Sequence, residues 1–155
     1  MIQAVIQTLM GIIGAFGFAL LFNVRRGKLV AVSLGAGVCW VVYLLVYSNC
    51  QDKVISLLFA TMAAALISEV LARVMKAPVT ILLVPILIPL IPGSDLFYTT
   101  SNLVRGDAVQ SAYYGSLVLK EAGAIAFGII LVPCIGQIIM KIWRLLRNIL
   151  QGGKR

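Results

Sequence analysis

Histidine is missing from this chain of 155 residues, and charged residues make up only 12% of it. Without histidine, the chain lacks the commonest metal ligand and proton shuttle of proteins. Its three cysteines, Cys39, Cys50 and Cys134, are scattered and form no CxxC pair, so they fit isolated small apolar residues. No nucleophile, base and orienting group occur at a workable spacing. We therefore expect no enzyme, no metal and no other cofactor.

Apolar side chains are what the chain has in excess, since 61% of its residues are hydrophobic and the mean hydropathy is +1.05. A soluble domain of this length could not bury so much apolar surface, so we expect the surplus to face lipid. Several runs are long enough to cross a hydrocarbon core of about 30 Å at about 1.5 Å per residue. The predicted fold class is all-α, a polytopic helical membrane protein forming a single transmembrane domain over residues 1–155.

Charge and turn residues divide the chain into five predicted spans and a tail. The spans cover about 2–22, 29–47, 54–75, 79–96 and 111–142, and a basic tail follows at 143–155. Ten of the thirteen Lys and Arg fall in alternate connections and the tail. The positive-inside rule then predicts an outer N-terminus and a cytoplasmic C-terminus. This topology accounts for the net charge of +8, which indicates contact with membrane lipid and not with nucleic acid.

The fourth predicted span contains the proline-rich run PVTILLVPILIPLIPGSD, residues 78–95. Pro85, Pro89 and Pro92 are spaced four and three apart, so they share one face of any residual helix, and Gly93 follows. Each proline removes a backbone donor and frees a carbonyl group that lipid cannot satisfy. We predict a broken span whose freed backbone lines a substrate path, as in transporters with discontinuous helices. An ordinary kinked span packed by its neighbours is the alternative.

Two polar residues near the predicted cytoplasmic side are further candidates. Glu69 is an acid embedded in the third span, where a carboxylate is costly and is by default a functional candidate. It is predicted either to couple protons or substrate to transport, or to pair with Arg73 at i+4 on the same helix face. Asn23, which closes the first span, is predicted to cap that helix or to donate into a pathway.

Four residues lie where the predicted outer side begins. Lys120 and Glu121 open the main apolar part of the fifth span, and if Asp107 is the N-cap, both lie in the outer leaflet and face a cavity. If the membrane begins at residue 122, both are interfacial. Asp95 and Tyr98 follow the proline break, where they either guard an outer mouth or belong to a plain loop.

Small residues recur in the predicted spans and indicate close packing between helices. The GxxGxxG pattern lies inside the first span with no preceding strand, so it does not predict a dinucleotide-binding loop. The glycines concerned are Gly11, Gly14, Gly17, Gly35, Gly37, Gly123 and Gly128.

Four stretches together resemble the threonine/serine exporter family, in its small-subunit form. They are GFALLFNVRRGKL (17–29), GAGVCWVVY (35–43), SEVLARVMKAP (68–78) and LVPILIPLIPGSDLFYT (83–99). The resemblance implies one five-helix half of an exporter whose other half is a larger membrane subunit with a soluble cytoplasmic portion. It also implies a bacterial-type inner membrane, threonine and serine as substrates, and coupling to the proton gradient, with Glu69 as the place to look for it.

Several functions stay open at this level. A split pair in the family is associated with export of the dicarboxylate succinate, so the substrate is either an amino acid or a dicarboxylate. The chain is predicted to work with the larger subunit or as a homo-oligomer. A non-transporting assembly subunit and a pore-type channel are the competing hypotheses.

Overall fold

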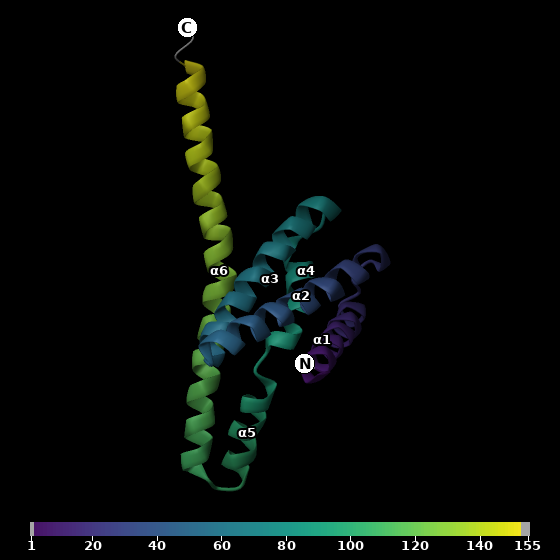
Figure 1. Cartoon of the computed structure of the whole chain (residues 1–155), viewed down its shortest axis with the longest axis vertical. Helices are drawn as coiled ribbons and strands as arrows, with labels where there is room; N and C mark the ends of the chain where they lie inside the picture. Colours follow the sequence, from purple (N-terminus) through teal and green to yellow (C-terminus); the bar gives the residue numbers. More distant parts are fainter. Residues whose placement is uncertain (1, 153–155) are drawn as a thin grey trace.

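The computed structural model describes residues 2–152, with side chains described up to residue 143. This part of the chain is built from helices joined by short turns (Figure 1). In chain order they are α1 (Ile2–Leu21), α2 (Arg26–Cys50), α3 (Lys53–Met75), α4 (Val79–Leu87), the 3₁₀ turn η1 (Ile88–Leu90), α5 (Gly93–Val104) and α6 (Ala108–Gly152).

Four of these helices are long and apolar enough to cross a membrane: α1, α2, α3 and α6 up to Trp143. The segments Val79–Leu90 and Gly93–Val104 make a fifth candidate span if they count as one, although they meet at a bend of 62°. The all-helical, multi-pass fold class is therefore confirmed, and so is the proline-broken fourth span.

The region after the break differs from the sequence prediction. Residues that we assigned to the end of the fourth span and to the following connection form the separate helix α5, in which Thr99 and Thr100 bond the carbonyl groups of Asp95 and Leu96. The next helix, α6, has 45 residues and is about 65 Å long, twice the hydrocarbon thickness. It includes the predicted tail up to Gly152, whereas residues 153–155 lie outside the described residues.

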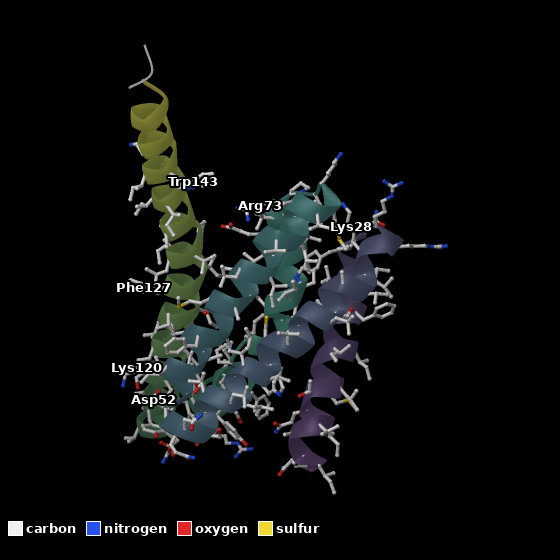
Figure 2. The ribbon with its side chains drawn as sticks, turned by 45° about the horizontal axis from the view of Figure 1, so that its top comes forward. Lys28, Asp52, Arg73, Lys120, Phe127 and Trp143 are labelled. Atoms are coloured by element: carbon white, nitrogen blue, oxygen red, sulfur yellow. The ribbon has the colours of Figure 1, made fainter. Side chains whose placement is uncertain are left out.

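Helix α3 lies at the centre of the bundle, where it packs against α2, α4 and α6. Helix α1 packs on α2, and α5 packs on the first part of α6, so that these two helices form a hairpin extending away from the other helices (Figure 1). Figure 2 shows Lys28 and Arg73 at one end of the bundle and Asp52 toward the other. We call these the basic end and the turn end.

Local chemistry explains where the helices stop. Asn23, Gln51 and Lys76 have φ values of 54°, 54° and 47°, which end the preceding helices in the left-handed conformation. Asp52 then caps α3 by accepting bonds from the backbone N–H groups of Val54 and Ile55 at 2.7 and 3.2 Å. Because Asp52 caps the helix, the side chain of the neighbouring lysine is left to reach across the bundle.

The predicted small-residue packing is found at some glycines and not at others. A Cβ atom on Gly128 would overlap the Thr61 hydroxyl oxygen, so α3 and α6 cross closely there. A Cβ atom on Gly37 would lie 2.7 Å from the side chain of Ile12, which brings α1 and α2 together. Within the described part of the chain, no heavy atom of another helix lies within 4 Å of the corresponding positions on Gly14, Gly17 and Gly123.

Candidate functional site

A cavity of about 350 Å³ lies toward the turn end, where the broken fourth segment meets α2, α3 and α6. Its volume is at the lower end of the range of about 300 to 1,000 Å³ that is typical of small-molecule sites. The lining residues are Trp40, Tyr43, Lys53, Leu57, Pro89, Leu90, Ile91, Pro92, Gly93, Ser94, Asp95 and Glu121. Five of the predicted pathway residues are thus brought together: Pro89, Pro92, Gly93, Asp95 and Glu121.

The break itself forms one wall of this cavity. Ile91 is extended (φ −66°, ψ 129°), as expected of a residue that precedes proline. Pro92 (φ −76°, ψ 63°) makes an inverse γ-turn that is closed by a bond of 2.7 Å from the Gly93 N–H to the Ile91 carbonyl. Helix α5 starts directly afterwards, so its first turn of backbone N–H groups lies at the cavity, where it favours a negatively charged group.

An ion pair joins α3 to α5 at the cavity. The Lys53 Nζ atom lies 3.0 Å from Oδ2 of Asp95. The Asp95 side chain is only 6% exposed, whereas that of Lys53 is 47% exposed. A buried carboxylate needs such a partner, because an unpaired charge away from water is costly.

Nearly every other buried polar side chain of the described region has its partner nearby. Ser33, Ser56, Thr61 and Ser68 bond carbonyl groups one turn earlier in their own helices, and Ser111 bonds the Thr99 carbonyl. Such bonds let hydroxyl groups lie in an apolar helix bundle.

Two buried polar atoms are exceptions, since they find no hydrogen-bond partner among the described residues: Nε1 of Trp40 and Oε2 of Glu121. One is a donor and the other an acceptor, and both residues line the same cavity. Leaving a buried polar group unpaired costs about 1 to 3 kcal/mol, so these atoms mark the cavity as a place for a polar ligand.

Glu121 and its neighbour Lys120 have different surroundings. Glu121 is 2% exposed and faces the cavity, whereas Lys120 is exposed at the outside of α6 (Figure 2). Consecutive helical residues point about 100° apart, because an α-helix has 3.6 residues per turn. Asp107 is the N-cap of α6 and accepts a bond of 3.0 Å from the Gln110 N–H.

Glu69 and Arg73 lie near the basic end, remote from this cavity. Oε2 of Glu69 accepts a bond of 2.7 Å from Nη2 of Arg73, as the pairing alternative predicts. The pair lines a second cavity of about 430 Å³ with Pro133 and Gly136 of α6. Although this cavity is larger, its acid already has a partner on its own helix.

The remaining candidates do not line the first cavity. Pro85 is buried inside α4, and Tyr98 stacks on Tyr114 with ring centroids 5.1 Å apart. Asn23 is exposed at the end of α1, where its left-handed conformation fits a capping position.

Lys53 and Trp40 are among the lining residues that sequence reasoning missed. Lys53 directly follows Asp52 in the sequence, but Asp52 caps α3, and the Lys53 side chain pairs with Asp95 instead. Trp40 is one aromatic residue in an apolar helix, where it stacks on Tyr43 at 5.0 Å. A lysine at a span terminus and an indole in the adjacent span were the available signals.

A bundle of apolar helices with a discontinuous span and a polar cavity beside the break is typical of membrane transporters. The comparison with protein families agrees, because the family described as "Threonine/Serine exporter, ThrE" matches residues 7–135. The chain therefore belongs to the threonine/serine exporter family, which is a transporter family and not an enzyme family. The matched range contains every lining residue of the first cavity. Searches of curated proteins and of solved structures gave no match.

Proposed function

We propose that this chain is one subunit of a secondary exporter of threonine and serine, and that the cavity at the break is its substrate site. The observation that supports this most strongly is the pair of unpartnered atoms, Trp40 Nε1 and Glu121 Oε2, in one cavity. Amino acids carry both an ammonium donor and a carboxylate acceptor. A ligand of this kind satisfies both atoms at once.

The charges of the cavity support an amino acid over a dicarboxylate. Its charged lining residues are one cation, Lys53, and two acids, Asp95 and Glu121. The ammonium group of an amino acid pairs with Glu121, while its carboxylate lies between Lys53, the indole of Trp40 and the first turn of α5. A dianion such as succinate would meet two carboxylates with only one lysine to offset them.

Two cavities on the same helix pair support alternating access. The first involves Lys53 of α3 and Glu121 of α6, and the second involves Glu69 and Gly136 of the same helices. Between them α3 and α6 cross closely at Thr61 and Gly128. In our proposal the basic end is cytoplasmic in a bacterial inner membrane, so the first cavity opens outward and the second inward.

We propose that the second half of the exporter is a larger membrane subunit of the same family. The helices of this chain expose much apolar surface, including Phe127, Ile130 and Ile138 on α6. A helical partner is expected to cover part of it, and lipid covers the rest. The pair, meaning this chain together with the larger subunit, is then the exporting unit, and the proton gradient drives it.

Export of labelled threonine from loaded membrane vesicles tests this function. We expect the pair to export threonine and serine against their gradients, and the rate to fall when the proton gradient is collapsed. Succinate in the same vesicles should stay inside, and vesicles with either subunit alone are the matched controls.

Three results would contradict the proposal. Export of succinate but not threonine by the assembled pair would show a dicarboxylate exporter. Unchanged threonine export after Trp40→Phe and Lys53→Met would indicate an assembly subunit whose partner holds the whole path. A current that persists without any gradient coupling would show a channel.

A further inference from the structure

The charges at the first cavity leave one carboxylate unbalanced. Lys53 and Asp95 form a neutral pair with 3.0 Å between Nζ and Oδ2. The charged groups that act on Glu121 are these two residues, from α3 and α5, and the cavity also holds Tyr43 from α2. Glu121 thus has no cation of its own, although it is 2% exposed.

A buried carboxylate without a partner has only two ways to avoid a large desolvation cost. It binds a proton and becomes neutral, or it pairs with a cation that enters the cavity. The ammonium group of an amino acid is such a cation. Both solutions can use the same oxygen, Oε2, because it is buried and has no hydrogen-bond partner among the described residues.

We propose that Glu121 exchanges a proton for the substrate's ammonium group, so that proton and amino acid occupy this site in turn. This inference rests on the proposed function and adds the residue that links substrate to proton. In the step, the Glu121 carboxylic acid releases one proton to water, and the carboxylate that forms accepts hydrogen bonds from the ammonium group. No covalent bond to the substrate forms, and one proton leaves for each amino acid bound.

In this exchange, a proton moves inward for each amino acid that is exported, so the two cross the membrane in opposite directions. When the cavity opens outward, release of the amino acid leaves Glu121 unpaired, so a proton enters from outside. When the site faces inward, an amino acid displaces that proton. In this scheme Glu121 always holds either a proton or an amino acid when the protein changes conformation. The conformational change with an unpaired, buried carboxylate is then too costly to occur.

Proton release on substrate binding tests the exchange in the purified pair. Threonine is added in weakly buffered detergent solution with a pH indicator, and its affinity is measured by calorimetry from about pH 5 to about pH 9. We expect release approaching one proton per threonine at the acidic end. Threonine affinity should rise with pH there by up to about tenfold per pH unit.

Glu121→Gln is the decisive variant, since its amide oxygen still accepts a bond from the ammonium group but carries no titrating proton. We expect it to bind threonine more weakly, without proton release and with an affinity that does not change over the acidic range. Asp107→Asn, at the exposed N-cap of α6 and outside both cavities, is the matched control, and it should release protons as the wild type does. The purified variants are compared by thermal unfolding to show that both are folded.

Proton release that persists in Glu121→Gln would overturn the exchange, and so would its loss in Asp107→Asn alone. Either result leaves threonine export by the pair intact, so the proposed function and this inference fail separately. If neither the wild-type pair nor the Glu121→Gln pair binds threonine while the wild-type pair still exports it, the cavity is not the substrate site. The proposed exchange at Glu121 is then wrong as well.

Discussion

Replacing Pro92 by alanine is expected to reduce threonine export at least tenfold while the protein stays folded. Pro92 keeps Ile91 extended and thereby holds α5 at 62° to the preceding segment. Alanine removes that restriction and has a helix propensity about 3 kcal/mol better than proline. The two helices are then free to join, which carries Asp95 away from Lys53. Loss of one charge-assisted hydrogen bond, worth about 1.5 kcal/mol or more, corresponds to a factor of about ten.

Pro85→Ala is the matched control for this experiment. Pro85 lies inside α4, where the helix continues through it, and it does not line the cavity. Most of the export should therefore remain. Vesicle export of labelled threonine measures both variants, with thermal unfolding as the folding check. A folded Pro92→Ala protein that exports at the wild-type rate would show that the bend has no part in transport.

The second large effect is expected for Lys53→Met, which removes the cavity's cation. Asp95 is then left buried and unpaired beside Glu121, so we expect both lower stability and at least a tenfold loss of export. Because half of the Lys53 side chain is exposed, the stability loss should be about 1 to 3 kcal/mol, below the value for a fully buried pair. Chemical unfolding in detergent measures it.

Asp95 provides the control for this charge argument. Asp95→Asn leaves Lys53 partly in water, where an unpaired ammonium group costs little, so its stability loss should be the smaller one. The double variant Lys53→Met with Asp95→Asn should recover part of the stability lost by Lys53→Met alone, although not its export. If all three variants lose the same free energy of unfolding, Lys53 does not stabilise the buried Asp95 as the geometry indicates.

The break in the fourth span is the part of the site that the sequence predicted best. Proline acts through its own backbone and that of the residue before it, so its effect is local and visible in the order of residues. The separate helix after the break was less visible, because the serine and threonine residues of α5 are typical of loops. There, Thr99 and Thr100 bond carbonyl groups of their own helix instead.

The grouping of Glu121 with Asp95 and Lys53 could not be predicted in the same way. It depends on which face of α6 meets α3. That face is fixed by the close contact between Thr61 of α3 and Gly128 of α6, and Gly128 comes seven residues after Glu121. One residue of rotation would have placed Lys120 in the cavity. The sequence identified Glu69 as an embedded acid and left Glu121 either in the outer leaflet or at the interface. Only the fold shows that Glu69 is paired and that Glu121 is buried and unpaired among the described residues.

Protection of the cavity by substrate is the most direct test of the account. A cysteine is introduced by Ser94→Cys in a pair whose native Cys39 and Cys134 are replaced by alanine, while the exposed Cys50 is kept as an internal control. We predict that threonine slows modification of the introduced cysteine by a polar thiol reagent and leaves the rate at Cys50 unchanged, whereas succinate changes neither. Equal rates with and without threonine, in a pair that exports it, would contradict the claim that substrate occupies the cavity at the break.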